Sequence, residues 1–81
     1  MKANRHSVRL DHGAALRVPS PNDANGRNAL WRWLGDCGFA ADDGQAVQVL
    51  TQAGTAVARP GDWIVLSVSG DFYVARPDWT N

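Results

Sequence analysis

Residues 59–79 read RPGDWIVLSVSGDFYVARPDW and carry the strongest strand signal in the chain. Two apolar runs, residues 63–68 and 72–75, are rich in β-branched and aromatic residues and are separated by Ser69 and Gly70. Such runs between glycine and proline are typical of β-strands, and a Ser-Gly link favours a tight hairpin. We therefore expect a β-hairpin against which the remainder of the chain packs.

The hairpin should begin at a turn and run through the middle of a sheet. Pro60 and Gly61 fit the central positions of a type II turn, because proline presets φ and glycine accepts a positive φ. Residues 63–68 are mostly apolar on both faces, which is typical of a central strand covered on each side. We expect one face of this strand to lie under a helix.

A single amphipathic helix is predicted at residues 25–34, with Asp23 or Asn25 as its N-cap and Gly35 at its end. The apolar stripe of this helix follows the spacing i, i+3, i+4 and i+7, which faces a core. Its members are Leu30, Trp33, Leu34 and Cys37. Trp31 falls off the stripe, so this aromatic side chain is the one we expect to face solvent or a partner.

Three further strand segments complete the expected fold. Residues 8–18 read as one bent edge strand, and residues 46–51 and 55–58 read as a pair joined by a short loop in which Gly54 takes a positive φ. The order strand, helix and then four strands predicts an α+β domain, with one helix packed on a curved antiparallel sheet of about five strands. A small, partly open barrel is the alternative form of this sheet.

The length and charge of the chain limit its organisation and its partners. With 81 residues, it is expected to form a single domain over residues 1–81, with flexible segments at residues 1–6 and 19–27. Eight basic residues balance eight acidic ones, which argues against a duplex DNA binder.

The cellular setting is expected to be the cytoplasm. The chain has one cysteine, which favours a reducing compartment because no internal disulfide can form. A helix that spans a membrane needs about 20 consecutive apolar residues. No apolar run in the sequence approaches this length, so no membrane partner is expected.

Catalytic and metal-binding readings find little support in the sequence. His6 and His12 are too few for a metal site, which needs three or four converging ligands. Cys37 lies on the helix stripe and is read as structural. Asp62 and Asp71 could form a hydrolase pair, but aspartate beside glycine usually bonds backbone N–H groups in a turn. We expect no cofactor, no metal and no enzymatic activity.

Partner-binding candidates come from the aromatic and charged side chains that the core does not require. The acidic Asp42-Asp43 corner suits a basic partner or simply forms a turn, and an aromatic-basic group near the C-terminus could stack on single-stranded bases or line the rim of the core. The candidate residues are Trp31, Asp42, Asp43, Tyr73, Arg76 and Trp79.

The last third of the chain resembles a group of small uncharacterised proteins of tailed bacteriophages and prophages. The shared signature is Pro-Gly-Asp-Trp-Ile at residues 60–64, Gly-acid-Phe-Tyr at residues 70–73, and then Pro77 and a closing aromatic, here Trp79. The group usually has glutamate where this chain has Asp71. The resemblance implies a phage origin and carries no catalytic residue.

The expected function follows from this resemblance, the small size and the four tryptophans. It is a phage or prophage accessory protein that works in the host bacterial cytoplasm by binding a host protein or defence complex, such as a CRISPR effector. The alternatives are a self-associating virion or assembly module, in which sheet edges pair between copies, and a small barrel that binds single-stranded nucleic acid.

Overall fold

The computed structural model describes residues 12–77 of the chain. Its elements follow one another in the order β1 (His12–Arg17), α2 (Ala24–Leu34), η1 (Gly35–Cys37), β2 (Gly38–Ala40), β3 (Val47–Thr51), β4 (Gly54–Ala58), β5 (Trp63–Ser67) and β6 (Phe72–Ala75). The strands and α2 confirm the expected α+β class. Within these residues, no helix has both the length and the hydrophobicity that a membrane crossing needs.

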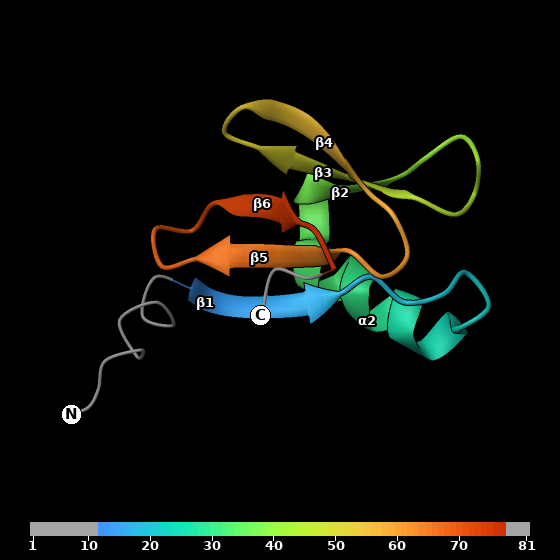
Figure 1. Cartoon of the computed structure of the whole chain (residues 1–81). Helices are drawn as coiled ribbons and strands as arrows, with labels where there is room; N and C mark the ends of the chain where they lie inside the picture. The colour runs from blue at the N-terminus through green and yellow to red at the C-terminus, as the bar shows by residue number, and fades with distance from the viewer. Residues whose placement is uncertain (1–11, 78–81) are drawn as a thin grey trace.

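The strands form two sheets rather than one. Each has three antiparallel strands, in the orders β1-β5-β6 and β2-β3-β4, and Figure 1 shows β3 and β4 of the second sheet above β6, an edge strand of the first. The prediction of a single curved sheet of five strands is therefore wrong, and the described strands close into no barrel. The prediction that residues 63–68 form a central strand is confirmed by β5, which lies between β1 and β6.

The turn after β4 explains why the sheet divides. The N–H of Val18 donates to the carbonyl of Asp62 at 2.8 Å, and the N–H of Gly61 donates to the carbonyl of Val18 at 2.9 Å. These bonds attach the turn to the end of β1, so β5 continues along β1 and does not return along β4. Gly61 has φ 94°, which confirms the positive φ expected at this position.

The helix is close to the predicted one, and the segment after it is not. The Asp23 carboxylate caps α2 by accepting from the N–H of Gly26 at 2.9 Å, and Gly35 ends the helix with φ 58°. The short strand β2 was not expected, because three residues of sequence Gly-Phe-Ala show too little alternation to indicate a strand. Its pairing with β3 gives the second sheet an additional edge.

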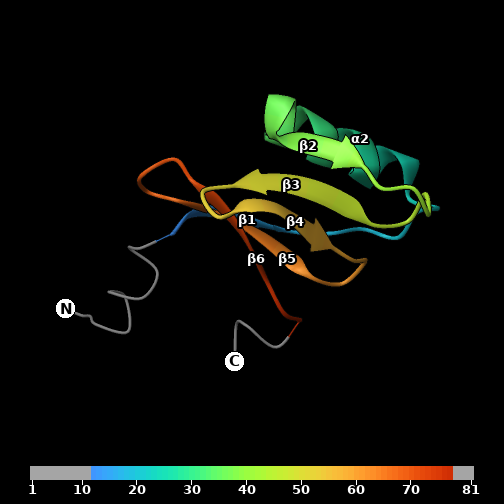
Figure 2. The same cartoon turned by 90° about the horizontal axis from the view of Figure 1, so that it is seen from above.

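The core lies between α2 and both sheets. In Figures 1 and 2, α2 runs behind the β1-β5-β6 sheet, with β2 and β3 nearby. Side chains from the helix meet side chains from both sheets in one buried cluster. Its members are Val18, Leu30, Leu34, Val47, Val49, Ala58 and Ile64. Trp33 closes the edge of this cluster with Phe72, whose ring centroid is 5.2 Å away at an interplanar angle of 81°.

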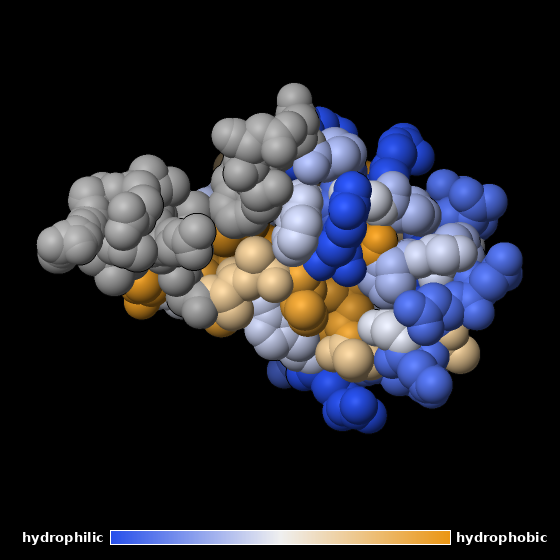
Figure 3. Space-filling model, turned by 60° about the horizontal axis from the view of Figure 1, so that its bottom comes forward, coloured by the Kyte–Doolittle hydropathy of each residue, from blue (hydrophilic) through white to orange (hydrophobic). Residues whose placement is uncertain are grey.

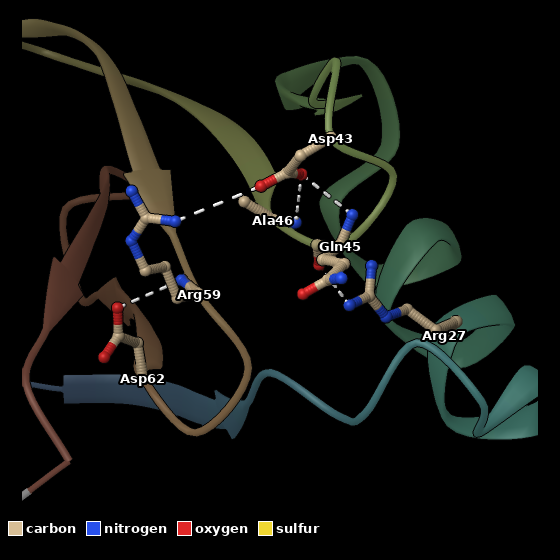
Figure 4. A network of polar contacts seen from close by, with 6 residues as sticks. All are labelled: Arg27, Asp43, Gln45, Ala46, Arg59 and Asp62. Atoms are coloured by element: carbon tan, nitrogen blue, oxygen red, sulfur yellow. Dashed lines mark hydrogen bonds and ion pairs between the residues drawn. The ribbon is translucent and has the colours of Figure 1, made fainter.

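A buried arginine ties the helix to two loops. The Arg27 guanidinium donates from Nε to the carbonyl of Pro19 at 3.2 Å. Its Nη2 atom donates to the carbonyl of Gln45, as Figure 4 shows. A buried charge is tolerated only when hydrogen bonds replace its hydration, and here backbone carbonyls provide them. Arg27 lies on the buried side of α2 with Leu30 and Leu34, and it fixes the position of α2 against the loop before β3.

Candidate protein-binding surface

The two faces of the β2-β3-β4 sheet have opposite character. Residues that pair directly across antiparallel strands point to the same face, and alternate residues along a strand point to opposite faces. Val47 and Val49 point inward and are fully buried in the core. The opposite face, which we call the outer face, consists of the residues in between and their cross-strand neighbours. They are Phe39, Gln48, Leu50, Thr55 and Val57.

The outer face is apolar and open to solvent. Phe39 is 49% exposed, Leu50 47% and Val57 45%, and Phe39 and Val57 flank Gln48 in one cross-strand row. Single exposed hydrophobic residues are ordinary, whereas contiguous exposed apolar patches are typical of interaction surfaces, so this group is the candidate for such a surface. Half of the exposed large hydrophobic residues described in the structure lie on this face. All six are Leu16, Phe39, Leu50, Val57, Val68 and Tyr73.

A hollow of about 280 Å³ adjoins the outer face at Leu50. The pairing of β2 with β3 stops at Val49, so Leu50 extends past the end of β2. There the β3–β4 turn meets the β5–β6 turn and the end of η1. The hollow is lined by Cys37, Leu50, Thr51, Gln52, Gly70, Asp71 and Phe72. Its volume lies at the lower limit of the range of about 300–1,000 Å³ typical of small-molecule sites.

Charged residues stand at both ends of the outer face, and carboxylates outnumber guanidiniums. Exposed Asp42 and Asp43 occupy the turn between β2 and β3, where Arg59 approaches Asp43 at 4.0 Å (Figure 4). At the other end, Asp71 lines the hollow, and Asp36 precedes its wall at Cys37.

The Asp43 carboxylate is held by its own turn. Its Oδ1 atom accepts from the N–H of Ala46 at 2.9 Å and from the N–H of Gln45 at 2.8 Å. These donors, Ala46 first, lower the pKa of Asp43 below its ordinary value of 3.8, and Arg59 lowers it further. The expected turn role of Asp43 is confirmed, and its second oxygen is the one that faces Arg59.

The structure separates the residues expected to bind a partner. Trp31 is partly buried against the core, so it offers less surface than its place off the stripe suggested. Tyr73, 37% exposed, lies with Trp63 and the fully buried Val65 on the face of the β1-β5-β6 sheet opposite to Phe72, as expected. Arg76 contacts Asp62 at 3.4 Å. The described residues therefore form no single site from these candidates, and Trp79 lies outside them.

Sequence patterns do not single out Phe39, Leu50 and Val57 as binding candidates. Strand alternation places Leu50 on the face opposite to Val47 and Val49. The pairing of β2 with β3 is needed to place Phe39 on the same face as Leu50. The inward or outward direction of each strand follows only from the complete register.

A second apolar area reaches the surface on the underside of the molecule. Figure 3 shows a band of hydrophobic atoms there between hydrophilic neighbours. From β1, which lies lowest among the strands in Figure 1, Leu16 is 37% exposed. Leu16 is the one large hydrophobic side chain exposed among the described residues of β1, so β1 exposes less apolar surface than the three side chains of the outer face.

The residues considered for catalysis or metal binding lie in the following surroundings. Asp62 is buried and accepts from the N–H of Arg59 at 3.0 Å, which confirms its expected turn role. The Asp71 carboxylate accepts instead from the Ser69 hydroxyl at 3.1 Å. Cys37 is a free, partly buried thiol. Within residues 12–77, no three histidine, cysteine or acidic side chains come together as a metal site would require, and His6 lies outside this range.

Comparisons of this chain with family models, with curated proteins and with solved structures found no match.

Proposed function

We propose that this protein acts by binding another protein through the outer face of the β2-β3-β4 sheet. The supporting observation is that Phe39, Leu50 and Val57 expose nearly half of their surface on one face, while Val47 and Val49 on the opposite face of β3 are fully buried. Burying apolar surface is the main favourable term in association, so a face of this kind is best satisfied by a protein partner.

The partner we propose is a host protein of a bacterial defence system, bound in the cytoplasm, and the protein itself would be an accessory factor of a phage or prophage. This part rests on the resemblance of residues 60–79 to small phage proteins. The outer face adds a surface by which a small domain without a catalytic constellation among its described residues could block a larger effector. Phe39 is suited to act as an anchor in such a contact, because aromatic side chains bury a large area.

The test compares matched baits in an affinity capture from bacterial lysate, read by mass spectrometry. Phe39→Ala and Val57→Lys alter the outer face, and Ala29→Lys alters an exposed position on α2 as the control. We expect a protein that wild type and Ala29→Lys capture and that the two outer-face variants lose. With the purified partner, Phe39→Ala should weaken binding by about 2 kcal/mol, roughly 30-fold. A partner retained equally by all four baits would refute the role of the outer face.

Interference with defence is tested separately in cells. Bacteria carrying an active CRISPR system are challenged with a targeted phage while they express wild type or Phe39→Ala. Wild type should raise plaque formation and the variant should not. Unchanged plaque formation with wild type would exclude inhibition of that system while leaving the binding role of the outer face to the capture experiment.

Self-association is the second candidate, favoured by the position of apolar side chains on edge strands. β1 and β4 lie at sheet edges and carry Leu16 and Val57, which are both partly exposed. Light scattering coupled to size exclusion at several concentrations tests this. A mass that rises with concentration for wild type, and less for Val57→Lys, would support it. A constant monomer mass would exclude it.

A further inference from the structure

The hollow adjoins the outer face at Leu50, which lines the hollow and lies on that face, whereas Thr51 in the same lining belongs to the inward face. A partner that covers Phe39 and Val57 would therefore also reach the opening of the hollow. The size of the hollow, about 280 Å³, accommodates one large apolar side chain, and Leu50, Phe72 and Cys37 give it apolar walls. Interface anchors are typically buried in such hollows, where water is excluded around them.

The charges around this surface select the kind of segment that fits. Asp36, Asp42, Asp43 and Asp71 contribute four carboxylates near the outer face and the hollow, against the guanidinium of Arg59 that pairs with Asp43. A partner with carboxylates there would be repelled, whereas lysine or arginine would be attracted. Asp71 matters most among them, because it lies in the wall of the hollow itself.

We infer that the hollow receives an apolar side chain of the partner that stands beside a lysine or arginine, and that the Asp71 carboxylate meets this cation. The inference rests on the proposed function, since it names the chemistry of the partner segment that the outer face binds. The Asp71 carboxylate is already oriented, because its Oδ2 atom accepts from the Ser69 hydroxyl at 3.1 Å, and Ser69 in turn bonds Ser67 at 2.8 Å. These hydroxyl groups hold the Oδ2 atom of Asp71 within the β5–β6 turn, at the wall of the hollow that Asp71 lines.

Three small aromatic probes test the inference without a partner. They are 2-phenylethylamine, 2-phenylethanol and 3-phenylpropanoate, which share a phenyl group and differ in charge. Each is titrated into the isotope-labelled protein while amide chemical shifts are followed. We expect shifts at residues 50–52 and 70–72, with the amine bound more tightly than the carboxylate by about two- to fivefold, the range of an exposed ion pair. Added salt should reduce this preference.

Asp71→Asn and the matched variant Asp42→Asn complete the experiment. Both remove one carboxylate, but of the two only Asp71 lies in the hollow. The preference for the amine should disappear in Asp71→Asn and persist in Asp42→Asn. Absence of shifts at the hollow, equal affinity for amine and carboxylate, or an unchanged preference in Asp71→Asn would each overturn the inference. Because no partner enters the experiment, its failure is distinct from a failure of the capture that tests the outer face.

Discussion

The Asp62 carboxylate accepts a hydrogen bond from the backbone N–H of Arg59 at 3.0 Å, across the turn that joins the two sheets. The same oxygen accepts from the Arg76 guanidinium at 3.4 Å, so it connects the turn to the end of β6. Asp62 is only 4% exposed, while Arg76 extends into solvent. The carboxylate therefore belongs to the fold, and the turn that divides the strands into two sheets depends on it.

Replacing Asp62 by alanine should destabilise the fold by about 1–3 kcal/mol, because the N–H of the turn loses its acceptor. Urea unfolding followed by tryptophan fluorescence measures the change. The control is Arg76→Ala, which removes the other partner of the same oxygen but leaves the turn bond; this arginine is largely exposed. The control should therefore cost no more than about 1 kcal/mol, the usual limit for an exposed ion pair. An equal loss of unfolding free energy in the two variants would show that the ion pair with Arg76, and not the bond to the turn N–H, accounts for the stabilisation by Asp62.

The stability of the fold should fall in acid partly through Asp43. Its pKa in the folded protein lies below the ordinary value of 3.8, with the N–H groups of Ala46 and Gln45 as the main causes. A carboxyl group of this kind stabilises the fold above the unfolded pKa, and the contribution is lost as the pH falls through the folded pKa. The advantage of wild type over Asp43→Asn should therefore shrink between about pH 5 and pH 2.

Urea unfolding of both proteins across this range gives the pH dependence, and a carbon-detected titration of the side chain gives the pKa directly. Asp42→Asn serves as the control for removing one charge from the same turn. A midpoint for Asp43 at or above 3.8 would contradict the hydrogen bonds described for the turn.

The two faces of the second sheet should respond very differently to the same substitution. Val49 is fully buried, whereas Val57 is 45% exposed. Val49→Ala should cost about 2 kcal/mol, because two buried methyl groups are lost and a cavity remains. Val57→Ala removes the same atoms from the surface and should cost no more than about 0.5 kcal/mol. Thermal or urea unfolding measures both, and a large loss for Val57→Ala would mean that the outer face is covered within the monomer.

Local signals in the sequence were sufficient for most elements and insufficient for their assembly. The positions of glycine and proline predicted the turns, and the apolar stripe at i, i+3 and i+4 predicted the start of α2 to within one residue. The division into two sheets could not be inferred, because it depends on the hydrogen bonds between Val18 and the Gly61–Asp62 turn, which lie far apart in the sequence. The strand β2 was missed because three residues carry no period.

The surface was harder to predict than the fold for the same reason. The sequence favours aromatic residues that lie off the helix stripe or next to charges, yet Trp31 packs on the core and Arg76 is paired with Asp62. The outer face is a property of cross-strand register: Phe39 and Val57 become neighbours only through Gln48 of β3. Asp42 and Asp43, named from their sequence alone, do lie at one end of this face.

Gly38 marks a close approach of β2 to the helix. A Cβ atom at this position would lie 2.8 Å from both Cβ and Cδ1 of Leu34, although the backbone, at φ −114° and ψ 138°, suits any residue. Gly38→Ala should therefore be destabilising through overpacking alone, by about 1–3 kcal/mol, as measured by urea unfolding.

A double-mutant cycle with Leu34→Ala separates this clash from any other effect of Gly38. Leu34 is buried in the core, and its replacement by alanine alone should cost about 2–5 kcal/mol. In that background the clash with Cδ1 is gone and only the one with Cβ remains. Gly38→Ala should then cost less than it does in wild type, by at least about 0.5 kcal/mol, the lower end of coupling between residues in contact. Strict additivity of the two substitutions would show that β2 and α2 are not in the contact described, and that β2 moves away from the helix at little cost.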